Sequence, residues 1–307
     1  MRSLGDWIEG RLIGRAALVE RLLIGLLTGG HVLIEGVPGL AKTRAVRLLA
    51  EGVDASFARV QCTPDLMPSD LTGTPVFRPD TGSFDFTPGP IFNSIVLVDE
   101  INRAPPKVQS ALLEGMAEAQ VTVGGETREL PDPFMVVATQ NPIEHEGTFP
   151  LPEAQLDRFL FHALVDVPGP DEEMRILDLV DAEALGDQDA PARLLISDLA
   201  TARSAVREVH VAPALKEYVV RLVTATRDAD LCPEVQHPAS PRGSLALVAG
   251  ARARAWLDGR DYTTPEDVTA LAEDALAHRM VLTWRAEADG ATARGVVRGL
   301  LDTIEPL

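Results

Sequence analysis

Short apolar runs alternate with polar, glycine-containing segments through the first half of the chain. Three such runs are His31-Val32-Leu33-Ile34, Ile95-Val96-Leu97-Val98 and Phe134-Met135-Val136-Val137-Ala138. Runs of this length, rich in β-branched residues, are typical of strands buried on both faces of a parallel sheet. Further strands are predicted over residues 57–62, where apolar and polar positions alternate, and over 160–167. The pattern therefore predicts an α/β fold.

Helical spacing of apolar residues predicts helices over 16–27, from Arg44 onward and over 105–119. A short helix is also expected at 156–159, before the last strand. Beyond Glu172 the pattern is almost entirely helical, over residues 174–180, 196–206, 214–226, 245–257 and 265–277. Because Pro168-Gly169-Pro170 separates the two patterns, we predict a core domain over 1–168 and a smaller all-helical domain over 169–307.

Two β-hairpins are predicted within the core domain. Val76-Phe77-Arg78 and Ser83-Phe84-Asp85-Phe86 flank the turn sequence Pro79-Asp80-Thr81-Gly82, and residues 121–127 contain a Gly-Gly turn. The segment 64–90 is rich in proline, glycine and acidic residues, so a disordered surface loop is the alternative for the first hairpin. The phenylalanines of that segment favour an ordered structure that packs on the protein or binds a partner.

Composition narrows the class of protein. A length of 307 residues suggests two domains at about 150 residues each. No apolar run approaches the roughly 20 residues that cross a bilayer, and residues 1–11 do not resemble a signal peptide. We therefore expect a cytoplasmic protein without a membrane span. Cys62 and Cys232 are too few for a disulfide framework and are expected to be packed or free thiols.

The charge balance bears on partners. The chain carries 28 Lys and Arg against 46 Asp and Glu, for a net charge of −18. Nucleic acids are bound through clustered Lys and Arg, with release of counterions from the phosphates. This composition therefore disfavours a nucleic acid partner. A local basic cluster, Arg252, Arg254 and Arg260, is more typical of a solvated helix face than of a binding site.

A candidate phosphate-binding loop follows the strand at 31–34 and precedes the helix that opens at Arg44. A glycine-bearing loop that ends in Lys-Thr in this context surrounds phosphate oxygens with backbone N–H groups. Lys42 is expected to reach the β- and γ-phosphates, and the Thr43 hydroxyl to bind Mg²⁺. Ala41 stands where a glycine usually precedes the lysine, and we expect it to have a negative φ. An ordinary glycine turn is the alternative. The loop consists of Gly36, Val37, Pro38, Gly39, Leu40, Ala41, Lys42 and Thr43.

Polar residues at the ends of two other strands complete a candidate hydrolytic site, because ligands of α/β sheets bind at the carboxyl ends of strands. Asp99, which ends the run at 95–98, is expected to hold Mg²⁺ through its water shell. Glu100 is expected to orient and deprotonate the water that attacks the γ-phosphate. Asn141 could position that water, although Asn141-Pro142 is also a turn signal.

At this point the sequence resembles the MoxR family of AAA+ ATPases over nearly its whole length. Members of that family share Ala41 at the position that departs from the general loop pattern. The match weakens after Pro170. The segments that carry it are EGVPGLAKT (35–43), TPDLMPSDLTG (63–73), GPIF (89–92), VDEINRAPPKVQSALLEGM (98–116), ATQNP (138–142) and GTFPLPEAQLDRF (147–159), followed by 239–242 and 262–268.

The resemblance implies an αβα nucleotide-binding core of the P-loop type, followed by a helical lid. Residues 64–90 correspond to the family's insertion in the second core helix, and 121–130 to its hairpin before sensor 1. Asn141 matches sensor 1, and Arg158 matches the arginine finger that reaches the nucleotide of a neighbouring subunit. Arg242 matches the sensor 2 arginine of the lid. The backbone at Ile13 and Gly14 is expected to line the adenine pocket.

The resemblance also implies partners. Members of the MoxR family are homo-oligomers that hydrolyse ATP with Mg²⁺, and a hexameric ring is expected here. They are regarded as chaperone-like and often act with a von Willebrand factor A domain protein on a protein client.

Two other classes of protein are the alternatives. A DNA-dependent AAA+ motor of the helicase-related group shares the same insertion, but the net charge of −18 weighs against it. A monomeric nucleotide kinase or switch is disfavoured by the Asp99-Glu100 pair and by the motif around Arg158.

Overall fold

The computed structural model describes residues 1–143, 147–186 and 193–306, and the chain folds into two compact units. The first consists of Met1–Leu151 and Ala163–Asp198, and the second of Pro152–His162 and Leu199–Leu307. This division differs from the boundary expected at 168/169. Residues after 163 stay with the first unit because they pair with it: the Val165 N–H donates to the Glu35 carbonyl at 2.8 Å.

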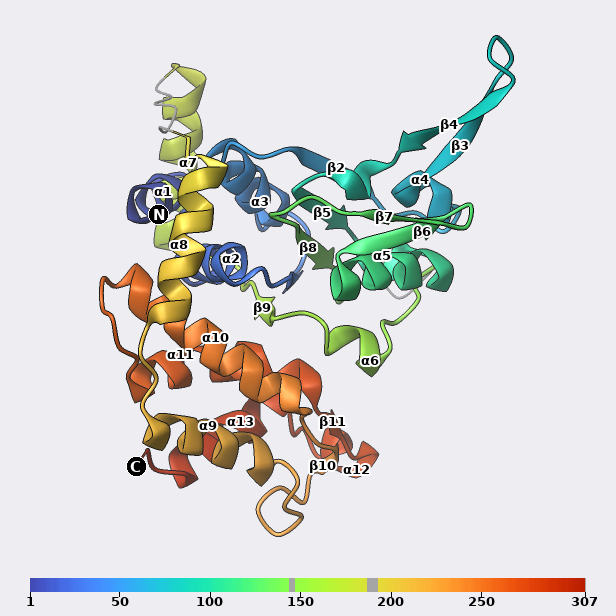
Figure 1. Cartoon of the computed structure of the whole chain (residues 1–307). Helices are drawn as coiled ribbons and strands as arrows, with labels where there is room; N and C mark the ends of the chain where they lie inside the picture. Colours follow the sequence, from blue (N-terminus) through green and yellow to red (C-terminus); the bar gives the residue numbers. More distant parts are fainter. Residues whose placement is uncertain (144–146, 187–192, 307) are drawn as a thin grey trace. The chain divides into compact units, whose positions relative to one another are not determined.

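A five-stranded sheet in the order β2-β5-β8-β1-β9 forms the centre of the first unit (Figure 1). The neighbouring pairs β2–β5, β5–β8 and β8–β1 are parallel, which confirms the predicted parallel sheet. The strands are β1 (Val32–Glu35), β2 (Phe57–Gln61), β5 (Ile95–Asp99), β8 (Met135–Gln140) and β9 (Phe161–Leu164).

Helices surround this sheet in the sequence intervals expected, with two additions, the first helix α1 and the short helix α4. Neither was predicted, although Leu4 and Ile8 of α1 have helical spacing and are buried. The helices of the first unit are α1 (Arg2–Glu9), α2 (Ala16–Thr28), α3 (Lys42–Glu51), α4 (Pro68–Thr72), α5 (Pro106–Glu118) and α7 (Pro170–Ala184), with 3-10 turns η1 (Pro90–Phe92) and η2 (Ile101–Arg103) beside β5.

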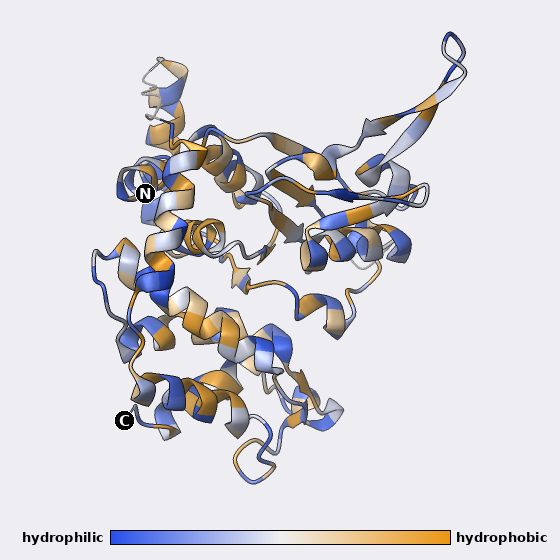
Figure 2. Cartoon of the chain, in the orientation of Figure 1, coloured by the Kyte–Doolittle hydropathy of each residue, from blue (hydrophilic) through white to orange (hydrophobic). Residues whose placement is uncertain are grey.

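The core lies between α2 and the inner strands. Every residue of β5 is buried, and hydrophobic residues dominate these strands and α2 (Figure 2). Gly25 lets α2 approach closely, because an added Cβ would lie 2.8 Å from the Met135 side chain and 3.0 Å from Val32. No helix among the described residues is long and apolar enough to cross a bilayer.

A buried histidine ties three of these elements together. His31 Nδ1 accepts a hydrogen bond from the Val136 N–H at 3.0 Å, so Nε2 carries the proton that is donated to the Met116 carbonyl at 3.1 Å. Burial lowers the pKa of His31 to about 4. The ring is therefore neutral at pH 7 and fixes the start of β1 against β8 and the end of α5.

Both predicted hairpins are confirmed. Strands β3 (Gly73–Arg78) and β4 (Ser83–Pro88) pair with Phe77 opposite Phe84, and their rings lie 5.2 Å apart between centroids. Strands β6 (Gln120–Val123) and β7 (Glu126–Glu129) meet at the Gly-Gly turn. The Arg128 guanidinium lies 3.9 Å from the centroid of the Phe86 ring, so a cation–π contact joins the two hairpins.

The second unit is mainly helical. Of the five predicted helical segments, 174–180 lies in α7 of the first unit, and the other four coincide within one residue with parts of α8 to α11. A two-stranded antiparallel pair, β10 with β11, was not predicted because its strands are only two or three residues long. The helix expected at 156–159 ends at Leu156 instead. The elements are α6 (Glu153–Leu156), α8 (Ile196–Glu208), α9 (Pro213–Ala225), β10 (Val235–His237), α10 (Pro241–Leu257), α11 (Pro265–Leu276), η3 (Ala277–Arg279), β11 (Val281–Leu282), α12 (Trp284–Ala288) and α13 (Ala293–Thr303).

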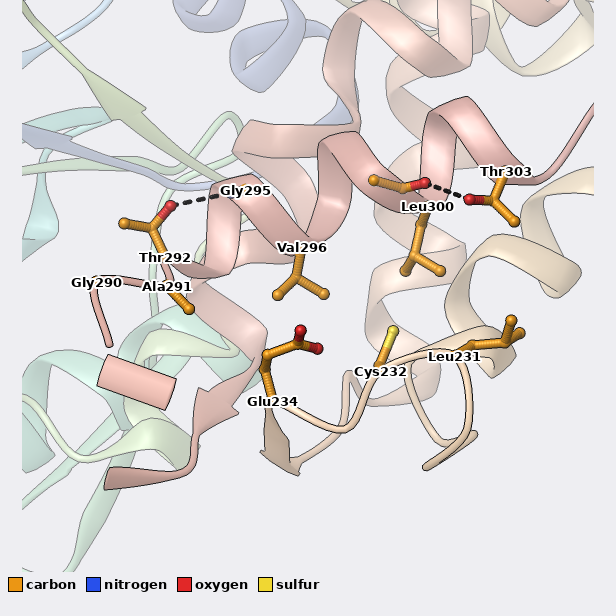
Figure 3. A pocket seen from close by; sticks show the side chains of 11 residues that line it. Leu231, Cys232, Glu234, Gly290, Ala291, Thr292, Gly295, Val296, Leu300 and Thr303 are labelled. Carbon is orange, nitrogen blue, oxygen red and sulfur yellow. Dashed lines mark hydrogen bonds between the residues drawn. The ribbon is translucent and has the colours of Figure 1, made fainter. Parts of the chain in front are cut away.

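A pocket of about 390 Å³ opens in the second unit beside α13 (Figure 3). Val296 and Leu300 line it from α13, and Cys232 and Glu234 line it from the loop between α9 and β10. Cys232 is a buried free thiol, as is Cys62 in the first unit, which confirms the expectation for both. Burial and nearby carboxylates raise the pKa of Cys232 above its ordinary value.

Two arginines of the cluster expected on a solvated helix face, Arg254 and Arg260, instead contact a buried carboxylate. Asp267 is fully buried and accepts hydrogen bonds from Arg254 at 2.8 Å and from both Arg260 Nη atoms at 2.7 Å. Burial alone raises the pKa of a carboxyl group. The hydrogen bonds from Arg260, the Thr264 N–H and Arg254 outweigh burial and leave the pKa of Asp267 below its ordinary value. These ion pairs bind the start of α11 to the end of α10.

We predict that Asp267→Asn lowers the free energy of unfolding by about 3–5 kcal/mol, because it leaves two guanidinium groups without their buried counter-charge. Asp258 pairs with the same Arg260 at 2.9 Å, but its side chain is 52% exposed. Asp258→Asn should therefore cost no more than about 1 kcal/mol. Urea unfolding of the two variants measures both values, and equal losses would contradict the assignment.

Candidate nucleotide-binding site

The loop between β1 and α3 leads directly into the lysine that the sequence singled out. Lys42 is the first residue of α3, and its Nζ donates to the carbonyls of Gly36 and, at 3.0 Å, Gln140. The ammonium group therefore lies between the start of the loop and the end of β8. Gly39 has a φ of +86°, and an added Cβ there would meet no atom within 4 Å. Glycine at this position serves the backbone conformation rather than packing.

The expectation of a negative φ at Ala41 is wrong. Ala41 is the N-cap of α3 and has a φ of +58° and a ψ of +22°, in the left-handed region. In an L-residue this conformation brings Cβ close to the following carbonyl oxygen and costs roughly 1–2 kcal/mol. The turn into α3, required to direct Lys42 back toward Gly36, imposes this conformation.

Asp99 collects hydrogen bonds from three neighbouring elements at the carboxyl end of β5. It is 5% exposed, and its Oδ1 accepts from Thr43 at 3.2 Å and from Thr139 at 3.0 Å. Its Oδ2 accepts from Arg59 Nε of β2 at 2.7 Å. The structure thus brings Thr43 and Asp99 together as the sequence predicted. The roles of Arg59 and Thr139 were missed, although both are polar residues within predicted strands.

Glu100 follows Asp99 in a strained conformation, with a φ of +56°. Its backbone N–H donates to Thr139 Oγ1 at 3.0 Å, which holds the turn. The carboxylate accepts from Gln61 at 3.1 Å and from Arg103 at 3.3 Å, and its side chain is 30% exposed. The Glu100 side chain is therefore held beside the end of β2 while it remains open to solvent.

Asn141 is buried after the end of β8. Its Oδ1 accepts from the Ile143 N–H at 3.2 Å, so the residue makes the strand-end turn that was the alternative interpretation. The Asn102 amide lies 3.5 Å from the Asn141 carbonyl, which links this turn to the segment after Glu100. The turn is observed, and contact with a water remains an expectation.

A small cavity of about 100 Å³ lies beside the phosphate-binding loop within the first unit. Ile13, one of the two residues expected at the adenine pocket, lines it together with Leu40 and Ala41, and α7 completes its wall. The contribution of α7 was missed, although Ile176, Leu179 and Val180 have the i, i+3, i+4 spacing of one helix face. Gly14 lies close to α7, because an added Cβ there would lie 2.3 Å from Glu172 Oε1.

The two predicted arginines belong to the second unit. Arg158 follows the short helix α6, and Arg242 lies in the first turn of α10. Both adjoin Asp157: Arg158 is the next residue in the chain, and Arg242 Nη1 lies 3.5 Å from Asp157 Oδ2.

The first unit therefore offers a donor set for a nucleotide and its cation. The loop supplies backbone N–H groups and the Lys42 ammonium for phosphate, and the cavity supplies apolar surface for a base. The Thr43 hydroxyl and the Asp99 carboxylate are hard oxygen donors, which suit Mg²⁺.

We predict that Ala41→Gly stabilises the chain by up to about 1 kcal/mol. Glycine removes the left-handed strain of roughly 1–2 kcal/mol and loses part of that gain to the entropy of the unfolded chain. Thermal unfolding without nucleotide should show a rise of a few degrees. The control Ala50→Gly lies in α3 and should destabilise by about 1 kcal/mol. A loss of stability in Ala41→Gly would contradict the strain argument.

Comparison with known families and structures agrees with this geometry. The family model "ATPase family associated with various cellular activities (AAA)" matches residues 31–161. A second model, "AAA lid domain", matches residues 227–300. The matches cover the phosphate-binding loop, Asp99, Arg158 and Arg242.

Several relatives align over nearly the full length. Chaperone MoxR1 of Mycobacterium tuberculosis is 47% identical, over 95% of this chain and 78% of its own length. The protein YeaC of Bacillus subtilis is 45% identical, over 98% and 92%. The protein MoxR of Methylorubrum extorquens is 34% identical, over 90% and 85%.

A crystal structure of a candidate ATPase from Cytophaga hutchinsonii superposes with a TM-score of 0.89 at 38% identity, covering 99% of this chain and 94% of that one. The fold thus agrees with that of a solved structure that covers nearly the whole chain. The chain belongs to the MoxR family of AAA+ ATPases.

Proposed function

We propose that this ATPase couples hydrolysis of Mg²⁺-bound ATP to chaperone-like remodelling or maturation of a protein complex, as a hexameric ring and with a von Willebrand factor A domain partner. The observation that carries the proposal is the convergence of Thr43 and Thr139 on Asp99, with the adjacent residue Lys42 directed to the carbonyls of Gly36 and Gln140. The MoxR-named relatives support the chaperone-like role.

Binding of the triphosphate is assigned to the loop and to Lys42. The carbonyls of Gly36 and Gln140 that now accept from Nζ are neutral, so an anionic phosphate oxygen would replace them favourably. Thr43 and Asp99 would hold Mg²⁺, which supplies charge neutralisation between the phosphates. Ile13 and Gly14 would contribute to the adenine site.

Glu100 is proposed as the base. It would accept a proton from the attacking water as the oxygen of that water bonds to the γ-phosphorus and the bond to the β-phosphate oxygen breaks, giving ADP and phosphate. Its exposure and its hydrogen bonds from Gln61 and Arg103 leave the carboxylate oriented and accessible. Asn141 would position the same water.

Arg158 of a neighbouring subunit and Arg242 of the lid would complete the site. A guanidinium is permanently charged and presents a planar fork of donors, which suits the charge that spreads over the transferred phosphoryl group. Because Arg158 is proposed to act on a neighbour's nucleotide, activity requires an oligomer. Arg242 would contact the γ-phosphate of the nucleotide bound to its own subunit.

The β3–β4 hairpin is the proposed contact with a protein client or partner. Phe77 is 51% exposed and Phe84 is 70% exposed, and together they present an aromatic pair on two antiparallel strands. Exposed aromatic residues are enriched in protein interfaces. The acidic balance and the MoxR-type relatives disfavour a DNA-dependent motor.

We predict that Lys42→Ala abolishes productive ATP binding, whereas Glu100→Gln binds ATP with near-normal affinity and hardly hydrolyses it. Lys42 contacts the phosphates before reaction, while Glu100 acts on the water. Equilibrium titration with a fluorescent ATP analogue and a phosphate-release assay separate the two effects. Arg47→Ala, on the exposed face of α3, is the control and should change neither. Equal loss of affinity in both site variants would refute these roles.

We predict that Arg158→Ala and Glu100→Gln subunits are each nearly inactive alone and regain activity when mixed. Loss of an arginine finger costs roughly 10³–10⁵ in rate, far more than a surface ion pair could. Random mixing creates some interfaces that join an intact Glu100 site to an intact Arg158. If assembly is normal and mixing restores nothing, Arg158 does not act across the interface.

A further inference from the structure

Arg279, a residue outside the nucleotide-binding motifs, is organised around the segment that carries Arg158. It lies in η3, directly after α11, and its side chain is only 3% exposed. Its Nε donates to Asp157 Oδ1 at 3.0 Å. Its Nη2 donates to the carbonyls of Asp157 at 3.2 Å and Phe159 at 2.6 Å, and its Nη1 donates to that of Leu160 at 3.3 Å. One guanidinium thus holds the backbone on both sides of Arg158.

Burying the charged guanidinium of Arg279 costs free energy, which indicates a specific role for the residue. Burial lowers the pKa of Arg279 to about 10, although Asp157 opposes the shift. The group remains charged at pH 7, and its charge is balanced by a carboxylate and several carbonyls instead of water. His278 adds a hydrogen bond to the Phe159 carbonyl at 3.1 Å, so that carbonyl is held twice.

Asp157 extends the same network to the start of α10. It accepts from Ser240 Oγ at 2.8 Å, and Ser240 is the N-cap of α10. Arg242, two residues later, forms an ion pair with the second Asp157 oxygen at 3.5 Å. The segment 152–162 accordingly belongs to the same compact unit as the lid helices.

We propose that Arg279 is a positioning residue for Arg158, which makes the finger a fixed part of the lid unit and links it through Asp157 to Arg242. The inference rests on the proposed action of Arg158 on a neighbouring subunit. Under this arrangement, a change that Arg242 undergoes on meeting a γ-phosphate is carried by Asp157 to the finger. One subunit's nucleotide state would then set the hydrolysis rate of its neighbour.

The test uses Arg279→Lys, which keeps the charge and loses the fork of donors. Its subunits should bind a fluorescent ATP analogue with wild-type affinity and assemble normally. They should hydrolyse ATP about 10²-fold more slowly, because displacing a catalytic group by about 1 Å costs that much in rate. Mixing with Glu100→Gln subunits, whose Arg279 and Arg158 are intact, should restore part of the rate.

The matched control is Arg254→Lys, another arginine of the same unit that donates to a buried carboxylate, Asp267. It should keep the wild-type rate per folded subunit. If Arg279→Lys does not fold, Asp157→Asn takes its place: it keeps the backbone hydrogen bonds from Arg279, so we expect a smaller loss of rate. Mixing should restore the part of that loss that is due to the finger, because Arg242 of the same subunit also loses its partner.

Three results would overturn the proposal. Arg279→Lys could hydrolyse ATP at the wild-type rate, or its loss could fail to recover in a mixture in which Arg158→Ala recovers, which would place its effect within its own subunit. If Arg158→Ala itself does not recover with Glu100→Gln, the proposed function of the finger fails, and the positioning role fails with it. The Arg158→Ala mixture therefore distinguishes the two failures.

Discussion

The hydrogen bonds on Asp99 are the contact on which the arrangement of the site depends. They join the end of β5 to the first turn of α3 through Thr43, to β8 through Thr139 and to β2 through Arg59. A buried carboxylate is stable only when such donors replace its lost hydration. The parallel register of the three strands supplies them, because parallel strands bring their carboxyl ends to one edge.

Backbone strain is concentrated at the same edge. Ala41 and Glu100 are two of the three non-glycine residues with positive φ among the described residues. Ala41 turns the chain into α3, and Glu100 turns it out of β5. Strain at functional positions is common, because the surrounding structure must over-determine a conformation that the residue itself disfavours. Here the Thr139 hydroxyl, shared between the Glu100 N–H and Asp99, supplies part of that constraint.

The second unit is stabilised by a different kind of contact. Asp267 and Asp157 each gather two arginines and a hydroxyl or backbone donor from separate elements. Such networks define a geometry more than they add stability, because the desolvation of the charges offsets much of their attraction. The Asp267 network fixes α11 on α10, whereas the Asp157 network fixes the segment around Arg158.

The sequence by itself determined the strands of the sheet, the two hairpins, most of the longer helices and the position of the phosphate-binding loop. The apolar runs at 31–34, 95–98 and 134–138, the two turn sequences of the hairpins and the loop at 36–43 are local patterns, and local patterns survive folding when tertiary contacts agree with them. The convergence of Thr43 and Asp99 also followed from sequence, since Asp99 ends one strand and Thr43 lies in the helix that opens after the loop at the carboxyl end of a parallel strand.

Only the tertiary structure decided the rest. The φ of Ala41 is imposed by the loop and not by the residue, whose own preference led to the opposite expectation. The sequence indicated a solvated face for Arg254 and Arg260, because only the packing of α11 on α10 brings their partner, Asp267, to them. Arg279 and Asp157 are 122 positions apart, and no periodicity connects them. Side-chain pairs at that separation are specified by the fold, because local spacing fixes only which face of an element a residue occupies.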